Sequence, residues 1–240
     1  MADLAVIVPS RGRPEAAVAL ARVFADTCIA HTRLVFAVDD DDPTRDQYLG
    51  ALDAFKTTSI AFAPSPSNMV TTLNWAAGSI LSGESSILAE APPFAVGFMG
   101  DDHCPRTYGW DQAYLDALRD LGTGIVYGND LLQGHRLPTQ CAMTADIVRA
   151  LGYMSPPSLK HLAVDNWWLE LGKGANCLRY LPDVIVEHRH PFAGKAQMDE
   201  GYQRVNSQAM YDHDLTEFER LRQVELPAAV AKIRALRGAA

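Results

Sequence analysis

Short apolar runs alternate with amphipathic helical patterns along the first two thirds of this 240-residue chain. Runs typical of buried strands occupy residues 4–8, 33–38, 59–62, 95–99 and 125–127, and helical patterns occupy residues 14–24, 69–81 and 109–121. A helix between two strands provides the crossover that parallel pairing requires. The alternation therefore predicts an α/β fold in which a mixed, mostly parallel sheet is flanked by helices.

The pattern becomes irregular after residue 127. We expect helices at residues 145–151 and 164–171, a last strand at 184–186, and a mobile loop at 153–162 that closes over a bound ligand. From residue 207 onward the chain has a charged helical pattern that Pro227 interrupts. We therefore predict a main domain at residues 1–192 and a C-terminal helical extension at residues 193–240.

The charge balance and the cysteines exclude several classes of protein. The formal net charge is −8, which disfavours a dedicated DNA- or RNA-binding module because such modules neutralise phosphates. The cysteines Cys28, Cys104, Cys141 and Cys177 lack zinc-ligand spacing, which favours free thiols in a reducing compartment. No segment approaches the roughly 18–20 apolar residues of a membrane span, and the N-terminal run is predicted to be a strand and not a signal peptide. We expect a cytoplasmic protein.

The segment VIVPSRGRP, residues 6–14, combines a buried strand with a basic turn just before a helix. Backbone N–H groups and the guanidinium groups of Arg11 and Arg13 suit the anionic or base-edge groups of a nucleotide. A polar surface turn with solvated arginines is the alternative.

The segment AVDDDDP, residues 37–43, carries four consecutive acids directly after a strand. Adjacent carboxylates repel each other, and Asp39, which is nearest the strand end, can hydrogen-bond a base or a ribose hydroxyl. The alternative is a solvated acidic loop that caps the next helix, which suits Asp41 and Asp42.

The sequence GDDH, residues 100–103, follows another apolar run and favours a divalent cation, because Mg²⁺ and Mn²⁺ prefer carboxylate oxygens. Along a strand alternate side chains share a face, so His188 and His190 of EHRHP are expected on one side and can complete this metal site. Imidazole ligands favour Mn²⁺ over Mg²⁺. The alternatives are a turn with helix-capping acids and a surface histidine pair.

The segment HLAVDNWWLELG, residues 161–172, begins a helix with Asp165 next to Trp167 and Trp168. A carboxylate beside indole rings can have a raised pKa and act as a general base, and an aromatic wall can hold a sugar ring. The alternative is a helix-capping aspartate beside core tryptophans.

The order of these segments, over about residues 4–191, resembles that of the GT-A glycosyltransferases, particularly the inverting family 2-like enzymes. The resemblance implies a Rossmann-like GT-A fold and a hexosyltransferase-type enzyme. Such an enzyme moves a sugar from a nucleoside diphosphate donor, by default a UDP-sugar, to an acceptor hydroxyl with Mn²⁺ or Mg²⁺. The acceptor stays open among saccharides, proteins and modified nucleobases.

The resemblance also implies roles for individual residues. It assigns the catalytic base to Asp165, the main metal ligand to Asp102 and the further ligand to His188 or His190, with His188 preferred. It assigns the binding of the nucleotide-sugar to Pro9, Arg11, Arg13, Asp39, Asn68 and Asp101.

The chain departs from the family pattern at two points. Val164 stands where the family has the first acid of the base motif, and GDDH can also be read as Asp101-x-His103, a version found in some retaining members. A sugar-nucleotide pyrophosphorylase and a non-catalytic nucleotide- or carbohydrate-binding domain are the rival functions.

Overall fold

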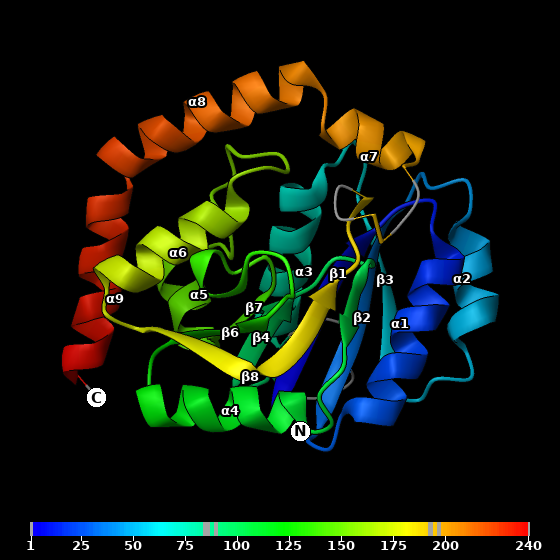
Figure 1. Ribbon diagram of the computed structural model, residues 1–240, viewed down its shortest axis with the longest axis horizontal. Helices are drawn as coiled ribbons and strands as arrows, with labels where there is room; N and C mark the ends of the chain where they lie inside the picture. Colours follow the sequence, from blue (N-terminus) through cyan, green and yellow to red (C-terminus); the bar gives the residue numbers. More distant parts are fainter. Residues whose placement is uncertain (1, 84–86, 89–90, 192–193, 196–197, 240) are drawn as a thin grey trace.

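A mixed sheet forms the centre of the protein, of which the computed structural model describes residues 2–83, 87–88, 91–191, 194–195 and 198–239 (Figure 1). The sheet has the strand order β3-β2-β1-β4-β7-β6-β8-β5. Its strands are β1 (Leu4–Ser10), β2 (Thr32–Asp39), β3 (Thr58–Ala63), β4 (Ala95–Phe98), β5 (His103–Pro105), β6 (Ile125–Asn129), β7 (Cys141–Thr144) and β8 (Leu178–His188). The helices are α1 (Pro14–Thr27), α2 (Arg45–Leu52), α3 (Met69–Ser82), α4 (Trp110–Leu121), α5 (Ala145–Leu151), α6 (Val164–Gly174), α7 (Glu200–Val205), α8 (Gln208–Val224) and α9 (Leu226–Ala239), with a 3₁₀ turn at Gly134–Arg136.

The predicted parallel pairing holds for one half of the sheet. Strand β1 pairs in parallel with β2 and β4, and β2 pairs in parallel with β3. Strand β7 is antiparallel to both β4 and β6, while β8 is parallel to β6 and antiparallel to β5. The sheet is therefore mixed, as the sequence predicts.

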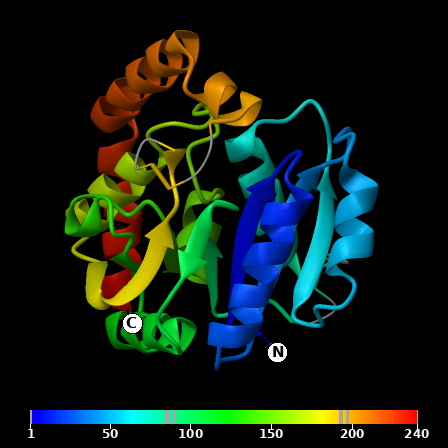
Figure 2. The same ribbon diagram turned by 45° about the vertical axis from the view of Figure 1, so that its right-hand side comes forward.

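The two faces of the sheet bury different helices because side chains alternate along each strand. Ala5 and Ile7 of β1 pack with α3, α5, α6, α8 and α9, whereas Leu4, Val6 and Val8 pack with α1, α2 and α4. Figure 2 shows α1 against its face of the sheet, with α9 on the far side of the molecule. Both faces are covered, so these strands contain continuous apolar runs.

Local signals account for the ends of the long helices. Helix α3 begins after Asn68, whose side chain accepts the Thr71 N–H while the Thr71 hydroxyl accepts the Asn68 N–H, and it ends at Gly83 with φ of 73°. Such a reciprocal cap satisfies two backbone donors that the helix itself leaves free. Pro227, where the sequence predicts an interruption, is the second residue of α9, a position where proline is tolerated.

Three elements were not predicted from the sequence. Helix α2 has a weakly apolar face, β5 has three residues, and β7 has four residues directly before α5. Strand β8 extends over 11 residues, whereas the predicted strand covers residues 184–186. Most residues of β8 are only partly buried, so its hydrophobic alternation is weak.

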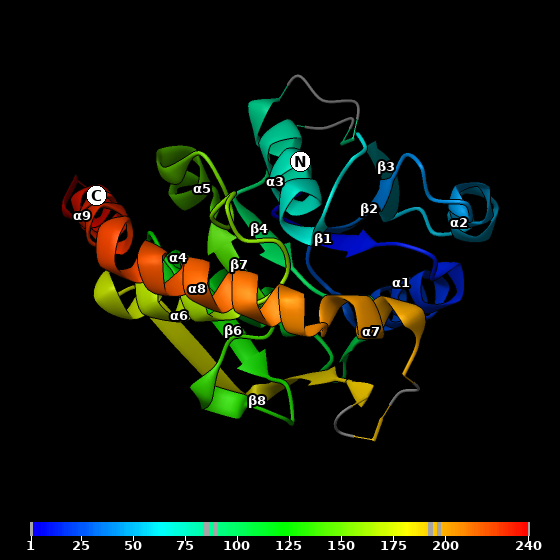
Figure 3. The same cartoon turned by 90° about the horizontal axis from the view of Figure 1, so that it is seen from above.

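The C-terminal helices lie across the molecule and join its core. Figure 3 shows α8 running from α9 toward α7 over the other elements. Leu221 of α8 and Ile233 of α9 are fully buried in the same apolar cluster as α3 and α6. The predicted domain boundary between residues 192 and 193 lies outside the described residues. Among the helices of the described ranges, none has the length and apolar character to cross a bilayer.

Candidate active site

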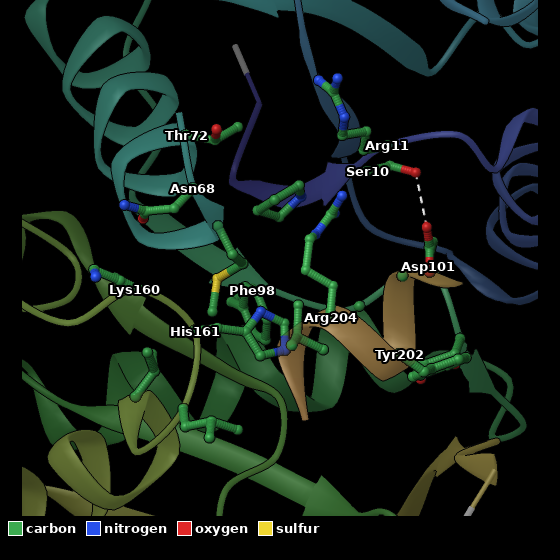
Figure 4. Close-up of a pocket in the computed structure, with 18 of the residues that line it drawn as sticks. Ser10, Arg11, Asn68, Thr72, Phe98, Asp101, Lys160, His161, Tyr202 and Arg204 are labelled. Atoms are coloured by element: carbon green, nitrogen blue, oxygen red, sulfur yellow. Dashed lines mark hydrogen bonds between the residues drawn. The ribbon is translucent and has the colours of Figure 1, made fainter. Parts of the chain in front are cut away.

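A cavity of about 670 Å³ opens where β1, β2 and β4 end, and α7 and the loop before α6 line it too. Figure 4 shows Ser10 at the end of β1, Arg11 just after it, Asn68 and Thr72 at the start of α3, and Tyr202 on α7 around this space. Every residue that the sequence assigns to the site lines the cavity, although their roles stay predictions: Pro9, Arg11, Arg13, Asn68, Asp39, Asp101, Asp102, Asp165, His188 and His190.

Asp39, at the end of β2, is held by donors from two sides. Arg11 donates to its Oδ2 at 3.0 Å, while the hydroxyls of Ser67 and Thr72 donate to its Oδ1 at 2.5 and 3.1 Å. These contacts fix the carboxylate at the edge of the cavity. Ser67 and Thr72 have no distinctive sequence signal, because polar residues around a helix start are ordinary caps.

The three acids after Asp39 each have a partner, which explains how four consecutive carboxylates are tolerated. Asp40 accepts the Ser65 N–H at 3.0 Å, and Asp41 pairs with Arg11. Asp42 is 2% exposed and accepts the Gly12 N–H at 2.7 Å. Asp42 thereby ties the turn after β1 to the turn after β2.

Asp101 pairs with the second arginine of the basic turn. Arg13 donates to Asp101 Oδ1 at 3.0 Å, and the Ser10 hydroxyl donates to Asp101 Oδ2 at 2.7 Å. Arg13 also donates to both carboxylate oxygens of Asp199, at 3.0 and 2.8 Å. The arginine therefore links the ends of β1 and β4 to the segment that leads into α7.

Asp102 and His188 form the centre of a candidate metal site. His188 Nε2 lies 3.2 Å from Asp102 Oδ2, and His103 Nδ1 lies 3.3 Å from Asp102 Oδ1. His103 and His188 are register partners on antiparallel β5 and β8, so their rings stack with centroids 4.3 Å apart. Each of these three side chains offers one possible metal-ligand atom, and the three atoms lie within 4.8 Å of one another.

His190 lies next to this group. Its ring meets that of His188 edge-on, with centroids 5.1 Å apart, and it lines the cavity. The expected alternation of His188 and His190 depends on a continuous strand, but β8 ends at His188. Alongside His188, the imidazole that the structure groups with Asp102 in the described residues is His103.

The chemistry of this group fits a divalent cation. Two ligands about 2.1 Å from an octahedral ion and at right angles lie about 3.0 Å apart, close to the separation of Asp102 Oδ2 and His188 Nε2. His103 Nε2 and His188 Nδ1 are buried without a hydrogen-bond partner among the described residues. A carboxylate combined with imidazole suits Mn²⁺ better than Mg²⁺.

Electrostatics keep the carboxylate of this group ionised. Burial alone would raise the pKa of Asp102, but its contacts with the His103 and His188 imidazoles hold that pKa well below its usual value. Burial lowers the pKa of His188, and the bond to Asp102 reverses this and raises it. The pair therefore combines an anionic oxygen with an imidazole, and an ion bound at His188 Nε2 would require that nitrogen to be unprotonated.

Asp165 stands at the first turn of α6, beside the fully buried Trp168. Its Oδ1 accepts the Asn166 N–H at 2.9 Å. Burial raises the pKa of Asp165 to about 6. A carboxylate of this kind can take a proton near neutral pH, as a general base must.

The loop at residues 153–162, expected to be mobile, is anchored by two side chains. Asn74 Oδ1 accepts the N–H groups of Met154 and Ser155, at 2.9 and 3.0 Å. The fully buried Asp214 of α8 accepts the N–H groups of residues 160, 161 and 162, at 3.1, 2.8 and 2.6 Å. His161 lines the cavity, and burial lowers its pKa to about 4.

Tyr202 is a further cavity residue without a distinctive sequence signal. Its hydroxyl donates to Asp102 Oδ2 at 2.7 Å, although 100 residues separate the two in the chain. It lies ahead of the charged helical pattern that begins at residue 207, in a stretch without a recognisable motif.

The fold of the chain is similar to the folds of several solved structures. No family model and no curated protein sequence matches the chain. TarS from S. aureus, residues 1–349, solved with UDP-GlcNAc, is 14% identical with a TM-score of 0.58 over 91% of this chain and 72% of that one. The mannosyltransferase PcManGT from Pyrobaculum calidifontis, solved with GDP-Man and Mn²⁺, is 12% identical with a TM-score of 0.58 over 97% and 73%.

A third similar structure is the glucosyl-3-phosphoglycerate synthase of Mycobacterium tuberculosis, solved with Mn²⁺, UDP and glucosyl-3-phosphoglycerate. It is 11% identical, with a TM-score of 0.54 over 98% of this chain and 80% of that one. At such identities a structural likeness establishes the fold. The chain has the GT-A fold, the fold of these nucleotide-sugar glycosyltransferases.

Proposed function

We propose that this protein is a metal-dependent glycosyltransferase that moves a sugar from a nucleoside diphosphate donor to an acceptor hydroxyl with inversion. The observation that carries the proposal is one cavity that joins the Asp102–His188 pair to a half-buried carboxylate, Asp165, whose pKa is raised to about 6. The three similar structures were solved with UDP-GlcNAc, with GDP-Man and Mn²⁺, and with UDP and Mn²⁺. We take a UDP-sugar as the default donor.

The nucleotide would lie along the ends of β1 and β2. Asp39 is oriented by Arg11 and two hydroxyls, so it can accept a hydrogen bond from the base or the ribose. Pro9 and Asn68 line the same cavity. Asp101, held by Arg13, would contact the ribose or the metal.

The leaving group is the part of the reaction where charge develops. Asp102 and His188 would hold Mn²⁺ or Mg²⁺, with His103 or His190 as a further ligand. The bound ion would supply electrostatic stabilisation of the departing diphosphate. Arg13 brings a positive charge beside this group through its bond to Asp101, the residue next to Asp102 in the chain.

Asp165 would be the general base of a single displacement. Its carboxylate accepts the proton of the acceptor hydroxyl while the hydroxyl oxygen bonds to the anomeric carbon. The bond between that carbon and the diphosphate oxygen breaks at the same time, and the nucleoside diphosphate leaves with the electron pair. The apolar wall of Trp168 limits water around the base.

Nucleotide binding with and without metal tests this function. UDP, GDP, CDP and dTDP would each be added to the protein with and without Mn²⁺, and the melting temperature recorded. A ligand at about 100 times its dissociation constant adds about 2.7 kcal/mol, which for a chain of this size raises the melting temperature by about 5 °C or more. We expect one base to give this shift, and only with Mn²⁺.

Matched variants and a turnover assay separate the rival functions. Asp102→Asn should abolish the metal-dependent shift, whereas Asp120→Asn, a surface acid paired with Arg179, should preserve it. Release of the nucleoside diphosphate from the matching sugar donor should need the metal. Binding without turnover would favour a non-catalytic nucleotide-binding domain, and no binding to any nucleotide would overturn the proposal.

A further inference from the structure

The segment that leads into α7 is tied to the candidate donor site. Asp199 accepts two hydrogen bonds from Arg13 and also caps α7 by accepting the Tyr202 N–H at 2.8 Å. The Arg13 guanidinium lies over the Tyr202 ring, 4.2 Å from its centroid. Tyr202 is 8% exposed. The Tyr202 side chain thus contacts Arg13 with its ring and Asp102 with its hydroxyl.

The Tyr202 hydroxyl and His188 Nε2 approach the same oxygen of Asp102. The hydroxyl donates to Oδ2 at 2.7 Å, and the imidazole nitrogen lies 3.2 Å from Oδ2. A carboxylate oxygen has two lone pairs, so both contacts can exist together. A cation bound between Asp102 and His188 would replace the imidazole contact and leave the phenol bond in place.

We propose that Tyr202 is a positioning residue of the metal site, which α7 completes. The inference rests on the proposed function in taking Asp102 and His188 as the metal ligands. The phenol holds the Asp102 carboxylate in the orientation that presents Oδ2 to a divalent cation beside His188. Hydrogen bonds to a ligating carboxylate commonly contribute a factor of 10–100 in metal affinity.

A coupling between the metal and α7 follows from this geometry. If docked α7 favours cation binding, the bound cation favours docked α7 by the same factor, because coupling between two binding equilibria is reciprocal. The cation should therefore protect α7 from cleavage. Trypsin can report this protection at Arg204, an exposed residue of α7.

Mn²⁺ binding alone provides the first test. The affinity would be measured from the electron paramagnetic resonance signal of free Mn²⁺ for the parent, Tyr202→Phe and Tyr211→Phe. The phenylalanine at 202 keeps the ring under Arg13 and removes only the hydroxyl. Tyr211, whose hydroxyl donates to Asn206 at 3.2 Å, is the matched control. We expect a 10–100-fold loss of Mn²⁺ affinity in Tyr202→Phe and none in Tyr211→Phe.

Proteolysis provides the second test. Mn²⁺ should slow tryptic cleavage after Arg204 in the parent and have much less effect in Tyr202→Phe.

Unchanged or tighter Mn²⁺ binding in Tyr202→Phe would overturn the inference, and tighter binding would mean that the hydroxyl competes with the ion. If the parent itself binds no Mn²⁺, the proposed function fails instead. Equal melting temperatures of the parent and Tyr202→Phe without metal would exclude misfolding as the cause.

Discussion

The buried carboxylate of Asp214 accepts the backbone N–H of His161 at 2.8 Å, which joins α8 to the loop beside the candidate base. The same carboxylate accepts the N–H groups of Lys160 and Leu162. This loop runs directly into α6, where Asp165 stands in the first turn. The C-terminal part of the chain thus positions the loop that lines the cavity before α6, as well as covering the core.

Replacing Asp214 should destabilise the whole protein. The variant Asp214→Ala leaves three partly buried N–H groups without their acceptor, so we expect a loss of about 3 kcal/mol in the free energy of unfolding, measured in urea. Asp212→Ala is the control, because Asp212 is exposed and bonds only Gln208 in the described structure. A loss below about 0.5 kcal/mol in Asp214→Ala, within the range of surface substitutions, would contradict this role.

The rate of sugar transfer should depend on the ionisation of Asp165. Burial raises the pKa of Asp165 to about 6, and a base accepts a proton only when it is ionised. We therefore expect kcat/KM to rise with pH through an apparent pKa near 6 and to level off above it.

The variant Asp165→Asn should lower kcat by about 100-fold or more. Asp146→Asn is a matched control outside the cavity, because Asp146 also begins a helix and accepts the N–H of the next residue at 2.9 Å. The base would lie elsewhere if Asp165→Asn transferred sugar as fast as Asp146→Asn.

The same substitution should stabilise the fold at alkaline pH. The folded pKa of Asp165 is raised from 3.8 to about 6, so between these values the folded state binds more protons than the unfolded state. The free energy of unfolding therefore falls as pH rises, by at most about 3 kcal/mol above pH 6. Asp165→Asn avoids this loss and should be more stable than the parent at pH 8 but not at pH 4. Equal stability of the two proteins at pH 8 would contradict the raised pKa of Asp165.

Asp39 should affect donor binding more than chemistry. Asp39→Asn loses the charge that pairs with Arg11 at 3.0 Å and weakens the acceptor offered to the nucleotide. We expect the donor KM to rise about tenfold with little change in kcat, as for the loss of one hydrogen bond to a charged group. Asp46→Asn, an exposed acid on α2, should leave both constants unchanged. A fall in kcat at constant KM would instead assign Asp39 to the reacting centre.

Residues adjacent to strand ends could be predicted because the signal is local. Asp39 and Asp101 each follow or end a buried apolar run, and Arg11 follows β1. The carboxyl ends of neighbouring parallel strands meet at one edge, so these side chains gather there whatever the details of packing. The structure places all three around one cavity.

Contacts that depend on register or on distant segments could not be predicted. The pairing of β5 with β8 sets His103 opposite His188, and the end of β8 at His188 removes the expected alternation with His190. The anchoring of the 153–162 loop depends on Asn74 and Asp214, which lie far from it in the chain.

The sequence by itself determined the α/β class, the two-sided sheet and the edge at which the polar residues gather. These features follow from hydrophobic periodicity and from the polar residues that come directly after each strand. Both signals are local, because each spans only a few residues of the sequence. The tertiary structure alone decided which histidine faces Asp102 and that Tyr202 reaches the same carboxylate. Those contacts arise from strand register and helix docking, which form only when segments some 100 residues apart pack together.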